Sequence, residues 1–164
     1  MAQAHELRCY DYVNHPYARV RDAVTADAGG IFARATKGAA ERAHELAATL
    51  KVDFGVLEVG TDVAIEVLRS YERPEGPIGK APTTFVDLDW KAARAATLFP
   101  SMVAQLIVYP LSRTETQLEL RGVYTPPLGA VGSALDSLVG HRLADASVHR
   151  FLTDVASLLR TELG

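Results

Sequence analysis

The chain has 164 residues, of which 17 are Lys or Arg and 20 are Asp or Glu, and its net charge is −3. Its hydrophobic content of 48% is that of an ordinary globular protein, so we expect one domain spanning 1–164. The acidic balance argues against a nucleic-acid partner, and the absence of an apolar run of about 18 residues argues against membrane insertion.

The first elements are separated by residues that break regular structure. The run 6–13 predicts a strand, and Asn14 is suited to cap a short helix over 16–24. The segment 25–30 interrupts the pattern, and 31–46 then predicts a second helix.

A hairpin is predicted next, with its two-residue turn at Gly60-Thr61. Its alternating apolar residues share one face of the two strands: Leu50, Val52, Phe54, Val56, Val63, Ile65 and Val67. The same period of two places Glu58, Arg69 and Tyr71 on that apolar face, nearer the ends of the strands.

Three further strands follow a loop at 73–80, and they cover 83–90, 101–109 and 115–124. The segment 91–100 fits either a helical turn or an irregular crossover. One face of each strand carries apolar or small residues: Val86, Leu88, Trp90, Ala104, Leu106, Val108, Leu118, Leu120, Gly122 and Tyr124.

The end of the chain, 129–163, contains no proline and predicts one long helix. Its second half presents large apolar side chains on one stripe: Val148, Phe151, Leu152, Val155, Leu158 and Leu159. The same stripe over 130–144 carries mostly small residues and His141. Small residues leave volume for a cavity, or they allow the sheet to approach more closely; the pattern alone permits both.

These elements predict an α+β fold. A meander of about six antiparallel strands would wrap as a curved sheet around the long C-terminal helix, with two short helices after the first strand. That helix is the only element large enough to cover the apolar face of the sheet.

The chain resembles the START-like superfamily, also called the helix-grip or SRPBCC group, which includes polyketide cyclase/dehydrase and lipid-transport proteins. The likeness covers nearly the whole chain in layout and is specific from Ser101 onward. It is carried by Leu118-Glu119-Leu120-Arg121-Gly122-Val123-Tyr124-Thr125-Pro126-Pro127-Leu128-Gly129, then Gly140-His141-Arg142 and Phe151-Leu152. The resemblance implies a deep cavity between sheet and C-terminal helix that holds an apolar or amphipathic molecule.

No motif in the sequence indicates a metal or a cofactor. The five histidines are scattered without metal-ligand spacing, the glycines do not form a phosphate loop, and there is no G-x-S-x-G elbow. The single cysteine, Cys9, excludes an internal disulfide, and the N-terminus lacks the features of a signal peptide, so a cytoplasmic protein is expected.

Three residues are candidates for catalysis: His141, Arg69 and Tyr71. His141 could act as a general base or contact a ligand, or it could simply be satisfied by a backbone carbonyl. Arg69 could bind a carboxylate or a phenol, or it could pair with an internal acid such as Glu58 or Asp145.

We predict binding of a small hydrophobic or amphipathic molecule by a monomer or homodimer. The residues expected to line the cavity are Phe54, Val56, Ile65, Val67, Val86, Leu88, Leu106, Leu120, Tyr124, Ala134, Leu138 and His141. The alternative is a polyketide cyclase/dehydratase-like enzyme that uses the same cavity without metal or nucleotide, and this ranks lower because the predicted lining is mostly apolar. A third alternative is an interaction domain with a filled core and an exposed apolar patch.

Overall fold

The computed structural model describes residues 4–49, 63–77, 79–92, 101–125 and 134–164, with side chains described for all of these except 37–49, 63, 92, 125 and 134–144. The elements in chain order are β1 (His5–Val13), α1 (Tyr17–Thr49), β2 (Val63–Arg73), β3 (Thr83–Ala92), β4 (Ser101–Pro110), β5 (Thr116–Thr125) and α2 (Ala134–Leu163).

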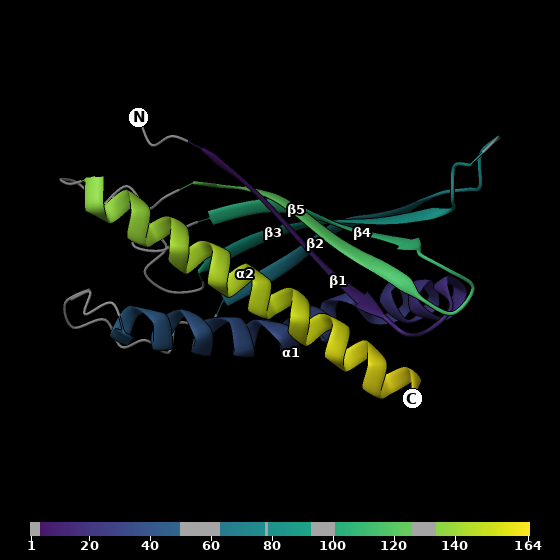
Figure 1. Cartoon of the computed structure of the whole chain (residues 1–164), viewed down its shortest axis with the longest axis horizontal. Coiled ribbons are helices and arrows are strands. Elements are labelled where there is room, and N and C mark those ends of the chain that lie inside the picture. The colour runs from purple at the N-terminus through teal and green to yellow at the C-terminus, as the bar shows by residue number, and fades with distance from the viewer. Residues whose placement is uncertain (1–3, 50–62, 78, 93–100, 126–133) are drawn as a thin grey trace.

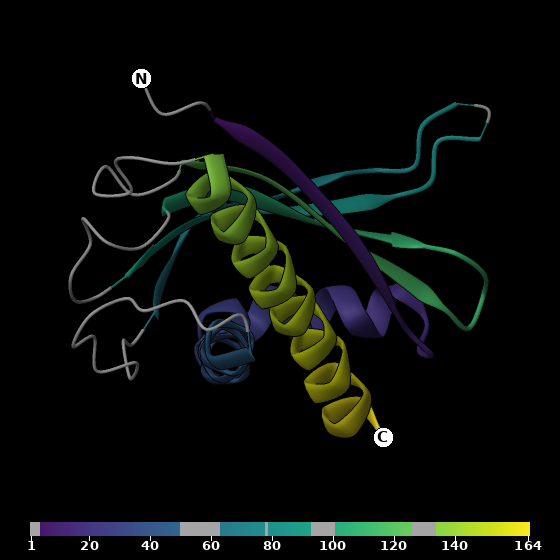
Figure 2. The same ribbon diagram turned by 60° about the vertical axis from the view of Figure 1, so that its left-hand side comes forward.

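The strands form one antiparallel sheet in the order β1-β5-β4-β3-β2. Both helices lie on the same side of this curved sheet, and α2 crosses it diagonally (Figures 1 and 2). The predicted architecture is therefore confirmed. Five strands are seen in the described residues, where about six were predicted; the additional strand was predicted at 50–58, outside the described residues.

The predicted break between two helices occurs as a kink within α1. Asp27 has non-helical angles (φ −146°, ψ 46°), and its carboxylate accepts a hydrogen bond from the Gly30 amide at 3.1 Å. A side chain that accepts from the amide three residues later is an N-cap, so Asp27 starts the second helical segment. The break is narrower than the predicted interval 25–30.

The two faces of the sheet follow the predicted alternation on β3, β4 and β5. Their inward residues are buried in the core, and α2 supplies Val148, Phe151, Leu152, Val155 and Leu159 from the predicted stripe. Three aromatic rings meet in this core: Phe151 lies 5.7 Å from Phe32 and 5.2 Å from Trp90, measured between ring centroids. The large-residue half of the helix thus packs solidly, as predicted.

One end of the interior is closed by the start of α1. This is the end at which β1 finishes, and we call it the Val13 end. There the Tyr17 hydroxyl lies 2.7 Å from the Thr84 hydroxyl, and Thr116 donates to the carbonyl of His15 at 2.8 Å. Val13 is fully buried beneath these contacts.

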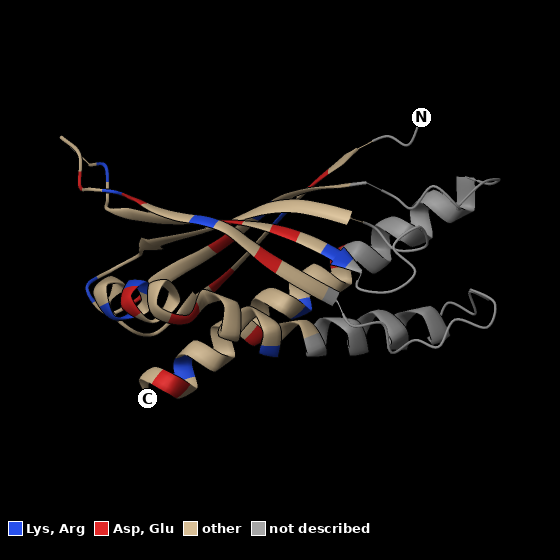
Figure 3. Ribbon diagram, turned by 180° about the vertical axis from the view of Figure 1, so that it is seen from behind, with Lys and Arg blue, Asp and Glu red and all other residues tan. Residues whose placement is uncertain are grey.

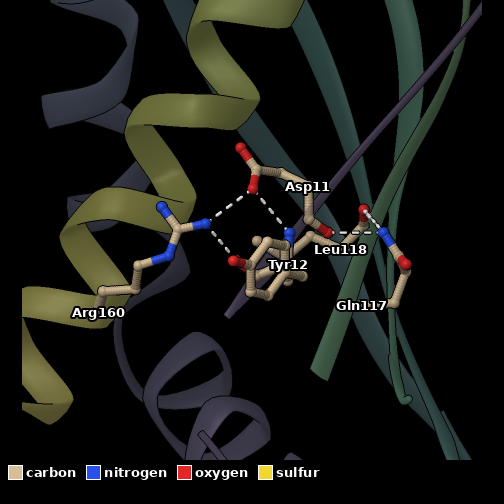
Figure 4. A network of polar contacts seen from close by, with 5 residues as sticks. All are labelled: Asp11, Tyr12, Gln117, Leu118 and Arg160. Carbon is tan, nitrogen blue, oxygen red and sulfur yellow. Dashed lines mark hydrogen bonds and ion pairs between the residues drawn. The ribbon is translucent and has the colours of Figure 1, made fainter. Parts of the chain in front are cut away.

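Arg160 fastens the C-terminal end of α2 to the last residues of β1 (Figure 4). Its guanidinium donates to the Asp11 carboxylate at 2.8 Å and to the Tyr12 carbonyl, and it lies over the Tyr12 ring. Gln117 of β5 donates to the Asp11 carbonyl at 2.7 Å. Residues from α2, β1 and β5 are therefore joined near the Val13 end.

A helix that spans a membrane must be both long and apolar. Over the described residues, neither helix combines the length and the apolar character of a span.

Candidate functional site

The structure corrects the predicted orientation of Arg69 and Tyr71. The pairing of β2 with β3 shifts register between Val67 and Arg69, and the extra residue, Leu68, is 52% exposed. A bulge of one residue reverses the facing of every residue that follows it. Arg69 and Tyr71 therefore lie on the outer face of the sheet and do not point into the interior.

On that outer face Arg69 pairs with Asp87, instead of the predicted Glu58 or Asp145. Gln105 donates to Asp87 at 2.7 Å and to the Tyr71 hydroxyl at 3.0 Å. Although partial burial acts to raise it, hydrogen bonds from Arg69 and Gln105 hold the pKa of Asp87 below its ordinary value. Arg69 is thus engaged in a surface network.

Glu119 is a second polar centre of the outer face. The colouring of the ribbon in Figure 3 shows that acidic and basic residues both occur along the strands. The side chain of Glu119 is only 4% exposed, and its carboxylate pairs with Arg8 at 2.9 Å and with Arg121. Arg8 and Arg121 are direct cross-strand partners. Because like charges placed opposite each other repel, the buried carboxylate between them compensates the pair.

The candidate site lies inside, at the opposite end of the sheet from Val13. We call it the Tyr124 end: β1, β2 and β4 begin there, and β3 and β5 finish there. The strand registers place one inward residue from each strand in a single row across the sheet: His5, Tyr124, Met102, Trp90 and Ile65. This row is richer in polar and aromatic groups than the row next to it, which consists of Leu7, Gly122, Ala104, Leu88 and Val67.

The aromatic residues of the row are packed and mostly shielded from water. Tyr124 is 2% exposed, and its ring stacks on His5 with centroids 5.2 Å apart and an interplanar angle of 21°. Trp90 is 7% exposed and contacts Phe151 edge-on, so it closes part of the core.

Asp145 of α2 brings a negative charge to the same end. Burial, together with the charge of Asp145, raises the pKa of Tyr124. Burial also raises the pKa of Cys9 to about 12, with smaller contributions from Asp145 and Asp11. Both the phenol and the thiol therefore keep their protons at neutral pH, and the phenol is suited to donating a hydrogen bond.

Among the described residues no group of acidic, histidine or cysteine side chains is arranged to hold a metal.

Comparison with solved structures shows which known fold this sheet and its two helices resemble. The aromatase/cyclase Zhui from Streptomyces sp. R1128 superposes with a TM-score of 0.52 and 13% identity, over 99% of this chain and 97% of that chain. The protein TTHA0849 from Thermus thermophilus gives a TM-score of 0.50 and 15% identity, over 98% of this chain and 100% of that chain. The chain has the START-like, helix-grip fold. No family model and no curated protein sequence matches it.

Within this helix-grip fold, the predicted lining residues differ in their surroundings. Ile65 and Val67 are half-buried and face inward from β2. Four others have no exposed surface and belong to the hydrophobic core: Val86, Leu88, Leu106 and Leu120. Tyr124 belongs to the row described above, and the side chains of the other five lie outside the described residues: Phe54, Val56, Ala134, Leu138 and His141. Their role in a helix-grip cavity stays a prediction.

Sequence reasoning missed two residues of the Tyr124 end, His5 and Met102, and it considered Asp145 only as a partner for Arg69. His5 precedes the predicted first strand by one residue, and its partner across the sheet is Tyr124. Met102 has the same parity as Ala104 and could have been assigned to the inner face from the alternation alone.

Proposed function

We propose that the protein binds a small hydrophobic or amphipathic molecule in the interior at the Tyr124 end. The observation that carries this proposal is the difference between the Val13 end and the Tyr124 end of the interior. The Val13 end is closed by α1 and by side-chain hydrogen bonds, whereas the row at the Tyr124 end sets aromatic rings beside the protonated hydroxyl of Tyr124. Mostly apolar walls with a few polar groups are the composition of small-molecule sites.

The residues predicted to line the site complete this proposal. Ile65, Val67 and Tyr124 contribute from the sheet, and Ala134, Leu138 and His141 would contribute from the N-terminal half of α2. The apolar walls would hold the body of the ligand, and the Tyr124 hydroxyl would donate to an oxygen of the ligand.

Native mass spectrometry of freshly purified protein tests the proposal, followed by extraction of any bound molecule. We expect an apolar or amphipathic molecule at a ratio near one to one. Ala134→Trp should abolish this binding with the fold intact. Val103→Trp is the matched control, because Val103 is 61% exposed on the outer face and the variant should bind normally. Retention of the ligand by folded Ala134→Trp would refute the proposed placement.

A second function, a cyclase- or dehydratase-like enzyme, is favoured by the place of the Tyr124 phenol, which is buried in the inward row of the sheet. A phenol that stays protonated can stabilise the oxygen of an enolate by hydrogen bonding. A protein of the same fold is an aromatase/cyclase, which makes this reaction class the one to test. Turnover of an aromatic polyketide-type substrate, lost in Tyr124→Phe without loss of binding, would support the enzyme over the binder.

A further inference from the structure

Met102 occupies the centre of the inner row at the Tyr124 end. It pairs across β4 and β5 with Tyr124 and across β4 and β3 with Trp90, so it stands between two aromatic residues. All three side chains are buried. Methionine is flexible and unbranched, and it repacks more readily than the rigid residues beside it.

The thioether of Met102 covers the inner face of Gly122. A Cβ atom at Gly122 would lie 2.7 Å from Met102 Sδ, 3.0 Å from its Cγ and 3.2 Å from the Cβ of Ala104. The backbone at Gly122 is not in the left-handed region, so its conformation does not require glycine. The missing side chain instead makes the space that the methionine fills.

The spacing of the strands on either side of β4 would accommodate a flat ring in place of the Met102 side chain. Adjacent strands are about 4.8 Å apart, so β5 and β3, which flank β4, are separated by roughly 9–10 Å. A flat ring in van der Waals contact with an aromatic residue on each side needs roughly 7–8 Å. A saturated ring system is thicker and cannot stack on the two walls.

We propose that Met102 is a displaceable plug and that the ligand carries a flat aromatic ring. On binding, the methionine turns aside, and the ring takes its place between Tyr124 and Trp90, over the floor formed by Gly122 and Ala104. This inference rests on the proposed function, because it assigns the ligand class and a specificity-determining residue to the same site.

The chain offers a direct probe of the plug, because it contains two methionines, Met1 and Met102. Protein labelled with ¹³C at the methionine methyl groups gives two signals, and Met102→Leu identifies the relevant one. We would titrate with 2-naphthol and with decahydro-2-naphthol, which share a skeleton and a hydroxyl but differ in flatness. We expect 2-naphthol to shift the Met102 methyl signal and to bind at least tenfold more tightly than its saturated analogue.

Variants test the plug independently of the spectrum. Met102→Ala should tighten 2-naphthol binding about fivefold, because no side chain has to move aside. Gly122→Val should weaken it at least tenfold, and circular dichroism establishes whether that variant folds. Val103→Ala, on the outer face of the same strand, should bind as the unmodified protein does. If Gly122→Val does not fold, the methyl signal and Met102→Ala decide the question.

The possible failures are distinguishable. Binding of 2-naphthol that leaves the Met102 methyl signal unmoved, or an unchanged affinity in Met102→Ala, would overturn the plug and leave the proposed function standing. Equal affinity for the two compounds would overturn the preference for a flat ring. If neither compound binds to the unmodified protein or to Met102→Ala, and nothing co-purifies, both the plug and the proposed function fail.

Discussion

Replacement of Arg160 by alanine should destabilise the protein by separating α2 from β1. Its guanidinium makes two hydrogen bonds, one to the Asp11 carboxylate and one to the Tyr12 carbonyl. Buried hydrogen bonds that involve a charged group contribute roughly 1.5–3 kcal/mol, whereas exposed ion pairs contribute about 0–1 kcal/mol. The side chains of Arg160 and Asp11 are 33% and 19% exposed, so the contact lies between these limits. We expect the free energy of unfolding to fall by about 2 kcal/mol.

Urea unfolding followed by tryptophan fluorescence measures this change, because Trp90 is the only tryptophan. Arg150→Ala is the control: Arg150 lies on the same helix and pairs with Asp154 at 3.0 Å within one turn. Such pairs contribute about 0.3–0.5 kcal/mol. A double-mutant cycle with Asp11→Asn should give a coupling of about 1 kcal/mol. If Arg160→Ala is no more destabilising than Arg150→Ala, or the cycle shows no coupling, Arg160 does not fasten the helix to the sheet.

Three further predictions concern the core, the thiol and the outer face. Phe151→Ala removes a fully buried ring that contacts two others, so it should lower the free energy of unfolding by about 3–5 kcal/mol. It should also shift the tryptophan emission to the red. A loss of stability below about 1 kcal/mol would contradict the described packing. Cys9 should resist a thiol reagent at pH 8 unless urea is added. The pKa of this thiol rises from 9.0 to about 12 on folding, so between these values only the thiol of the unfolded chain ionises. The free energy of unfolding should therefore fall from pH 9 to pH 12, and it should fall less steeply in Cys9→Ser. Glu119→Gln leaves Arg8 and Arg121 facing each other, so it should lower the free energy of unfolding by roughly 1–2 kcal/mol in low salt and by less in 1 M NaCl. A loss of stability that is the same at both salt concentrations would indicate lost packing instead of charge repulsion.

The facing of most strands could be predicted from the sequence, because antiparallel strands alternate with a period of two and one face is buried. The segments 83–90, 101–109 and 115–124 show this plainly. The bulge at Leu68 could not be predicted, since no glycine or proline marks it and both neighbours fit a regular strand. That single extra residue moved Arg69 and Tyr71 from the interior to the surface.

The site was harder to predict than the fold, because its residues come from separate elements. The stacking of His5 on Tyr124 depends on the pairing of the first strand with the last, and the effect of Asp145 depends on where α2 crosses the sheet. Alternation assigns a residue to a face but does not give its neighbours across the sheet. The covering of Gly122 by Met102 likewise follows only from the register of β4 and β5.

The two ends of the interior have different physical requirements, and the chain meets them with different residues. Near the Val13 end, Arg160 makes directional contacts to fixed backbone and carboxylate groups, which hold α2 in one position. At the Tyr124 end, the proposed plug is the most adaptable apolar side chain, beside a position where a side chain is missing. Arg160 contacts Asp11 and Tyr12 at the end of β1, whereas Met102 lies in the row of His5 at its start, so the two residues are far apart. Since substitutions at distant sites have additive effects, Arg160→Ala and Met102→Ala together should change stability by the sum of their separate changes. A ligand affinity measured well below the unfolding temperature should then depend on Met102 and not on Arg160.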